Sequence, residues 1–167
     1  DLPLDSMLQL DEREILLPED YDRIADLGWN AFAERYYSKF NPRPTAKILA
    51  WAERQTAGYL EDVKRWNEHG VPVYQGAEIF SPLMFFSIFR TLEQFTLDLY
   101  RRPDRVAAAM DGLVDDFIQD AIDLVKLTGL PWVTLILERG GCFYYPLRIF
   151  ERFEWPYLKK MTEAWVK

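Results

Sequence analysis

The sequence predicts a helix-rich α/β fold with few parallel strands. Trp132–Leu137 is a short apolar run, rich in β-branched residues, that starts after a proline and ends in charge and glycine. Such a run is typical of a strand that is buried on both faces of a parallel sheet. A second candidate strand, Val71–Glu78, lies upstream, and long amphipathic stretches separate the two. A connection of this length predicts parallel pairing with a right-handed crossover.

The composition is that of a globular protein and argues against several kinds of partner. Of the 167 residues 49% are hydrophobic, and no apolar run approaches the roughly 18 residues that a membrane helix needs. The net charge of −7 disfavours nucleic acid, because a phosphate backbone requires a basic face. A single cysteine excludes an internal disulfide, and the first residues lack a signal-peptide pattern. We therefore expect a cytoplasmic protein with no membrane or nucleic-acid partner.

The first 70 residues are expected to form a helical lead-in. Residues 1–17 have no clear period, and a proline followed by two acids at residues 18–20 predicts a helix start. The apolar stripe of this helix continues to about Tyr37. A second helix is predicted from about Thr45 to Glu68, and Gly70 suits a left-handed cap at its end.

Residues 71–167 are expected to continue as strand, helix, helix, strand and helix. Ser81 and Pro82 predict the cap and first turn of a single helix that is apolar nearly all round. A long helix follows from Pro103 to Thr128, with one apolar stripe and an acidic opposite face. After the second strand, a last helix is predicted to open near Pro146.

The main candidate ligand-binding residues lie at the end of the second strand. Glu138 and Arg139 follow it directly, and Gly140 and Gly141 come next. Ligands of α/β folds bind at the carboxyl ends of strands, and glycines allow them to approach the backbone closely. Arg139 is suited to bind a carboxylate, and Glu138 is suited to orient it or to carry a proton. A structural salt bridge explains the pair equally well, so both interpretations stay open.

Further candidates lie in the adjoining loops. Phe143 and Tyr144 belong to an aromatic loop after the second strand, which can line a ligand pocket. Ser81 follows the first candidate strand, where a helix cap accounts for it equally well. The lone His69 is expected to cap a helix end or face solvent, and the lone Cys142 to be inert. These two residues cannot supply a zinc site, so we expect no metal site in this chain.

Two stretches of the chain carry a family resemblance. One is ERGG…YP…FERFEWPYLKKM, which ends at Met161, and the other is LYRRPDRVAAAMDGLVDDFIQDAIDLVKLTG, which starts at Leu99. Together they resemble the uroporphyrinogen decarboxylase superfamily, which also contains corrinoid-linked methyltransferases. The resemblance covers residues 80–167 and implies a partial (β/α)8 TIM barrel, with residues 1–167 as a single segment. Because such a barrel takes roughly 250 residues, we expect an internal fragment of a larger enzyme.

The resemblance implies a lyase that acts on a tetrapyrrole-linked substrate without a cofactor, by decarboxylating porphyrinogen acetate side chains. The alternative within the family is methyl transfer from a corrinoid protein to a thiol, with zinc held by residues outside this chain. The family's catalytic Asp and arginine-rich loop have no counterpart here, and Ile88 and Arg139 stand where relatives have Tyr and Ser. We therefore expect this segment alone to be inactive and metal-free. The third interpretation, a non-catalytic helical interaction module, requires the two candidate strands to be helical or unpaired.

Overall fold

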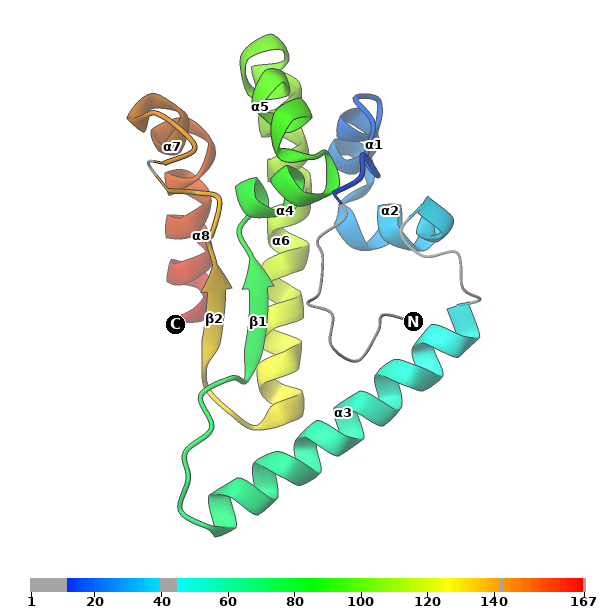
Figure 1. Cartoon of the computed structure of the whole chain (residues 1–167), viewed down its shortest axis with the longest axis vertical. Coiled ribbons are helices and arrows are strands. Elements are labelled where there is room, and N and C mark those ends of the chain that lie inside the picture. The colour runs from blue at the N-terminus through cyan, green and yellow to red at the C-terminus, as the bar shows by residue number, and fades with distance from the viewer. Residues whose placement is uncertain (1–11, 40–44, 142, 167) are drawn as a thin grey trace, which may run out of the picture.

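The structure is a computed structural model in which residues 12–39, 45–141 and 143–166 are described (Figure 1). Most of these residues are helical, and two short strands lie between the helices. In chain order the elements are α1 (Asp20–Leu27), α2 (Trp29–Arg35), the 3-10 helix η1 (Tyr37–Lys39), α3 (Thr45–Glu68), β1 (Ala77–Phe80), α4 (Pro82–Phe89), α5 (Leu92–Arg101), α6 (Pro103–Thr128), β2 (Val133–Ile136), α7 (Leu147–Phe153) and α8 (Trp155–Trp165).

The strands β1 and β2 form a two-stranded parallel sheet, as the length of their connection predicts. The register runs from Ala77 paired with Val133 to Phe80 paired with Ile136. The connection consists of α4, α5 and α6, and Figure 1 shows α6 running alongside the strands. The helix-rich α/β class with parallel strands is therefore confirmed, and within the described residues the sheet has two strands rather than the closed ring of a barrel.

The first strand begins later than the sequence indicates. Only the end of the expected strand Val71–Glu78 belongs to β1, and Val73 and Tyr74 lie in an irregular segment. Pro72 has no N–H to donate to a strand ladder, so the sheet cannot extend regularly through this segment. The segment contacts α3 instead, where the hydroxyl of Tyr59 donates a hydrogen bond to its backbone.

The prediction that Trp132–Leu137 is buried on both faces is wrong. Ile79 and Leu135 pack against the hydrophobic core on the face that α6 covers. Glu78 and Thr134, paired in the register, point to the opposite face and are exposed. The strand within this apolar run, β2, therefore has one face covered by α6, whereas Thr134 on its other face is exposed.

Two expected helices are each broken at a residue with positive φ. Gly28, at φ 78°, separates α1 from α2, although the sequence predicts one helix there. The single helix expected after Ser81 is divided into α4 and α5 by Thr91, at φ 65°. This conformation is unusual for a β-branched residue. Thr91 also caps α5, because its Oγ1 accepts a hydrogen bond from the backbone N–H of Gln94 at 3.3 Å.

The predicted bounds of α3 and α6 are confirmed. Each is followed by a glycine with positive φ, Gly70 at 73° and Gly129 at 68°. The predicted cap of α4 is also present, since Ser81 Oγ accepts a hydrogen bond from the N–H of Met84 at 3.2 Å. The last helix opens next to Pro146 as expected but is divided into α7 and α8.

Helix α6 is the central helix of the core. Helix α1 packs closely across it at Gly112, where a Cβ atom would lie 2.5 Å from the carbonyl oxygen of Ile24 and 2.8 Å from Cα of Ala25. Only glycine allows this approach of two backbones. The fully buried α6 residues are Val106, Ala109, Met110, Leu113, Val114 and Ala121.

A buried arginine joins the N-terminal segment to the junction of α4 and α5. Arg90 is 1% exposed and donates to Asp98 Oδ2 from Nε at 3.0 Å and from Nη2 at 2.7 Å. Its Nη1 donates to the carbonyl oxygen of Leu16 at 2.8 Å. Asp98 Oδ2 also accepts a hydrogen bond from the hydroxyl of Tyr21 at 3.0 Å. One ion pair thus connects three separate parts of the chain.

We predict that Gly112→Ala destabilises the protein by about 1–3 kcal/mol, because the new methyl group forces α1 away from α6. The matched control is Gly58→Ala in α3, where nothing lies within 4 Å of a Cβ atom. This control is expected to stabilise the protein by about 0.5–1 kcal/mol through helix propensity. Urea unfolding of both variants measures the difference, and equal effects would show that the close contact is absent.

We predict that Asp98→Asn destabilises the protein by about 3–5 kcal/mol, because it removes the fully buried counter-ion of Arg90 and leaves the guanidinium with the partly exposed carboxylate of Glu14. The control is Asp123→Asn, which removes an exposed ion pair with Lys126 and is expected to change stability by less than about 1 kcal/mol. Thermal and urea unfolding measure the change in stability of both variants. A loss at Asp98 no larger than the control would contradict the buried pair.

Candidate functional site

The carboxyl ends of β1 and β2 meet at one edge of the sheet, which we call the carboxyl edge. Ser81 directly follows β1, and its N–H donates to the carbonyl oxygen of Ile136, the last residue of β2, at 3.2 Å. Arg139 and Gly140 follow β2. Ligands of α/β folds bind at this end of parallel strands, which is where these sequence-predicted candidates lie.

Arg139 reaches across the carboxyl edge rather than pairing with its neighbour. Its Nη1 donates to Glu12 Oε1 at 2.5 Å and to the carbonyl oxygen of Ser87 at 2.8 Å. Its side chain is 15% exposed, whereas Glu138 is exposed and forms no ion pair with a described residue. The guanidinium therefore connects the N-terminal segment, the end of α4 and the loop after β2. The predicted pair Glu138–Arg139 does not act as a unit.

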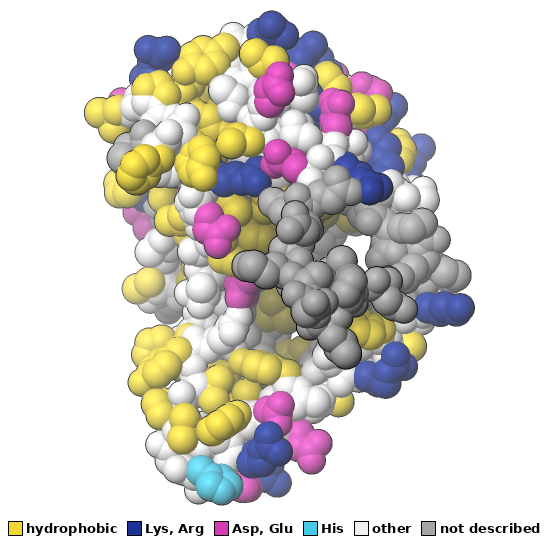
Figure 2. Space-filling model, in the orientation of Figure 1, with side chains coloured by type: hydrophobic (Ala, Val, Ile, Leu, Met, Phe, Trp, Pro, Cys, Tyr) yellow, Lys and Arg dark blue, Asp and Glu magenta, His cyan; other side chains and the backbone are white. Residues whose placement is uncertain are grey.

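The loop after β2 divides into a buried part and an exposed part. Gly140 is buried, whereas Gly141 is exposed. The side chain of Phe143 is 97% exposed, and Tyr144 is half exposed. Figure 2 shows hydrophobic side chains gathered over the α7 end of the molecule. These two aromatic residues thus form a surface rather than a pocket, and Cys142 lies outside the described residues.

Tyr145 is the buried aromatic residue of this loop. It is 2% exposed, and its hydroxyl accepts a hydrogen bond from Thr96 Oγ1 at 3.4 Å. Burial raises the pKa of Tyr145, and the charge of Arg139 opposes this effect. The phenol therefore stays protonated at neutral pH and anchors the loop against α5.

Glu154 is the functional candidate that the sequence reasoning missed. It lies at the junction of α7 and α8, is 1% exposed, and neither carboxyl oxygen has a hydrogen-bond partner among the described residues. A Cβ atom on Gly140 would lie 2.7 Å from Glu154 Oε1, so the carboxyl group packs directly against this glycine. Burial raises the pKa of Glu154 from its ordinary value of 4.5 to about 7, and the nearby hydroxyl of Ser81 offsets this only in part.

A signal for Glu154 exists in the sequence. Tyr157 and Met161 lie three and seven residues further on, at the spacing of one helix face, and both are buried. An acid on a buried helical stripe has to be paired, protonated or functional, because burying an unpaired charge is costly. The division of this stretch at Glu154 into two helices hides the pattern.

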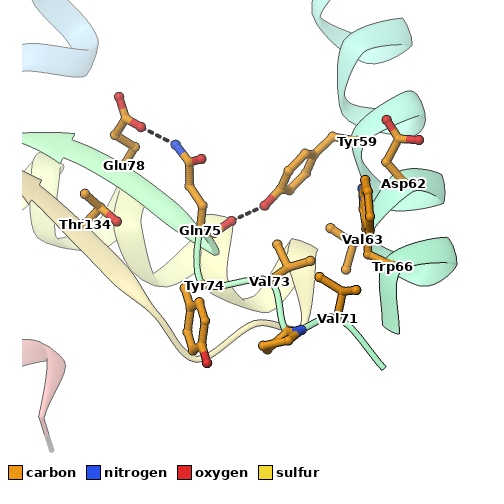
Figure 3. A pocket seen from close by; sticks show the side chains of 11 residues that line it. Tyr59, Asp62, Val63, Trp66, Val71, Val73, Tyr74, Gln75, Glu78 and Thr134 are labelled. Atoms are coloured by element: carbon orange, nitrogen blue, oxygen red, sulfur yellow. Dashed lines mark hydrogen bonds between the residues drawn. The ribbon is translucent and has the colours of Figure 1, made fainter. Parts of the chain in front are cut away.

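One sizeable cavity lies away from the carboxyl edge. It has a volume of about 690 Å³ and lies between α3, the irregular segment before β1 and the exposed face of the sheet (Figure 3). Trp66 and Val63 of α3 line one side, and Val73 and Tyr74 line the other. The cavity is open to solvent and mostly apolar, with no cation in its lining. Its polar side chains Gln75 and Glu78 are hydrogen-bonded to each other, and Tyr59 is bonded to the backbone of Gln75.

The remaining candidates have structural roles. His69 is exposed at the end of α3, and its Nδ1 lies 2.8 Å from the carbonyl oxygen of Arg65, as expected for a helix-end residue. Within the described ranges, no three His, Cys, Asp or Glu side chains are grouped to hold a metal ion. Asp116 and Asp120 of the acidic face of α6 accept hydrogen bonds from Asn30. In the same part of the chain, every helix is too short or too polar to cross a membrane.

Comparisons of the chain with models of protein families, with curated proteins and with solved structures found no match.

We predict that Glu154 makes the protein less stable as pH rises. The unfolded carboxyl ionises near pH 4.5, whereas the folded one keeps its proton until about pH 7. The free energy of unfolding therefore falls between these values, by about 3 kcal/mol in total, and is constant above them. Glu154→Gln removes this contribution, so the difference in stability between variant and wild type should grow across the same window.

Urea unfolding from pH 4.5 to pH 8 measures this difference. The control is Glu151→Gln, an exposed glutamate one turn earlier in α7, which is expected to follow the wild-type curve. A Glu154→Gln curve parallel to the wild type would contradict the buried, unpaired carboxyl.

Proposed function

We propose that this chain is a segment of a (β/α)8-barrel enzyme of the uroporphyrinogen decarboxylase type, which acts on the carboxylate side chains of a tetrapyrrole. The observation that carries the proposal is the parallel pairing of β1 and β2, with Ser81, Arg139 and Gly140 at their shared carboxyl edge. In barrels of this class the active site lies at that edge of the strands.

The small, one-sided parallel sheet supports a barrel rather than an isolated helical module. Parallel strands occur almost only in sheets that are covered on both faces. Here Glu78 and Thr134 leave one face exposed, and two strands alone are a marginal sheet. The interpretation as a non-catalytic helical module requires the two candidate strands to be helical or unpaired, whereas β1 and β2 are paired.

The chemistry of the carboxyl edge suits a ligand with several carboxylates. Arg139 presents a guanidinium, which binds carboxylates through two parallel hydrogen bonds. Gly140 and Gly141 leave the adjacent backbone without side chains. Phe143 and Tyr144 add exposed aromatic surface beside them, suited to a flat ring system. Zinc-dependent methyl transfer from a corrinoid protein is the competing activity of the same superfamily.

We predict that Arg139→Ala weakens binding of uroporphyrin, an octacarboxylic probe, at least ~10-fold, or roughly 1.4 kcal/mol. Quenching of tryptophan fluorescence measures the affinity. Arg101→Ala is the control, because Arg101 is exposed at the end of α5, and should leave affinity unchanged. Unfolding curves separate lost binding from the loss of the structural contacts of Arg139.

The reaction itself is tested on the protein that carries this segment. Release of carbon dioxide from a porphyrinogen supports decarboxylation, and Arg139→Ala and Glu138→Gln should each lower that rate at least ~10-fold with folding nearly intact. Formation of a methylated thiol instead would show that the activity is methyl transfer and not decarboxylation. Absence of both reactions, together with no porphyrin binding, would overturn the proposal.

A further inference from the structure

Glu154 is buried between the two halves of the carboxyl edge. Its carboxyl group lies against Gly140 of the β2 loop and close to Ser81 at the end of β1. The side chain is 1% exposed, and both oxygens lack a hydrogen-bond partner among the described residues. A native protein rarely buries a carboxyl group in this way, so the group calls for an explanation.

The surroundings of Glu154 favour its uncharged form. Ser81 approaches it from the junction of β1 and α4, and Tyr145 approaches from the loop, since the charge of Glu154 contributes to the raised pKa of that tyrosine. Arg139, the cation next to Gly140, is engaged with Glu12. On α7, Arg152 pairs with Asp104. An ionised Glu154 in this position is shielded from solvent and has no paired cation among the described residues, which is costly.

We propose that Glu154 is a proton-operated latch on the carboxyl edge. In the protonated form it packs against Gly140 and keeps the start of the β2 loop closed onto the junction of α7 and α8. In the ionised form it requires solvation, which separation of the Gly140 backbone from the carboxyl group would provide. That separation exposes Ser81 and the Arg139–Gly141 backbone. The inference concerns the conformation of the chain and does not depend on the proposed reaction.

The direction of the pH effect follows from the two states. The carboxyl group has a pKa of about 7 when closed, and when open and solvated it returns towards its ordinary value near 4.5. The open form therefore gains population about tenfold per pH unit from roughly pH 5 to pH 7. Above about pH 7 both forms are ionised and the population no longer changes. Closure is favoured in acid and opening at neutral pH.

Amide hydrogen exchange, followed by NMR, tests the latch. The N–H of Gly140 donates to the carbonyl oxygen of Leu137 at 2.8 Å, so its protection reports closure of the loop. After correction for intrinsic exchange, its protection factor should fall about tenfold per unit between pH 5 and pH 7 and then level off. In Glu154→Gln, which keeps the volume without the titration, it should stay constant. Glu151→Gln should behave as the wild type.

Low concentrations of urea distinguish local opening from complete unfolding. Local opening exposes little surface, so exchange at Gly140 should not respond to urea, whereas core amides such as those of Met110 and Leu113 in α6 should exchange faster. If Gly140 follows the α6 amides, the carboxyl group meets water only on global unfolding and the latch is wrong. An unchanged pH profile in Glu154→Gln would overturn it as well.

Discussion

The ion pair between Arg90 and Asp98 constrains the path of the whole first half of the crossover. In a continuous helix, residues eight apart are separated by about 12 Å along the axis, yet these side chains are in contact at 2.7 Å. The helix must therefore break between them, and Thr91 supplies the break with its positive φ. The cost of that conformation is offset by a pair that is fully buried and hydrogen-bonded to Leu16 and Tyr21.

This constraint also positions the carboxyl edge. The carbonyl oxygen of Phe89, the last residue of α4, accepts the N–H groups of Ile15 and Leu16, both at 2.9 Å. The N-terminal segment is thereby held beside α4, and Glu12 reaches Arg139. The contacts of the candidate arginine thus depend on a buried ion pair in another part of the crossover.

The sequence predicts the features that local chemistry decides. Gly70, Gly129 and the Ser81 cap end or start helices through their own backbone and side-chain preferences, and those bounds are correct. The break at Thr91 could not be predicted, because no glycine or proline marks it in the sequence. It is imposed by the tertiary ion pair between Arg90 and Asp98. Glu154 was missed because the division of this stretch into α7 and α8 hides the buried helical spacing that it shares with Tyr157 and Met161. The location of the predicted site at the strand ends follows from the parallel topology. The partner of Arg139, Glu12, is 127 residues away in the sequence and could not be predicted from it.

The charges at the carboxyl edge decide what a ligand must do there. Arg139 is already bound to a carboxylate, that of Glu12, whose side chain is 33% exposed. A partly exposed ion pair of this kind contributes about 0–1 kcal/mol. A ligand carboxylate therefore replaces a weakly held one of the same charge, and the guanidinium is never left unpaired. In acid the buried Glu154 is uncharged and does not repel an anionic ligand at the carboxyl edge. Once Glu154 is ionised, it repels such a ligand. Such an exchange of carboxylates would let a chain with a net charge of −7 meet the proposed acidic ligand without leaving a further charge unpaired.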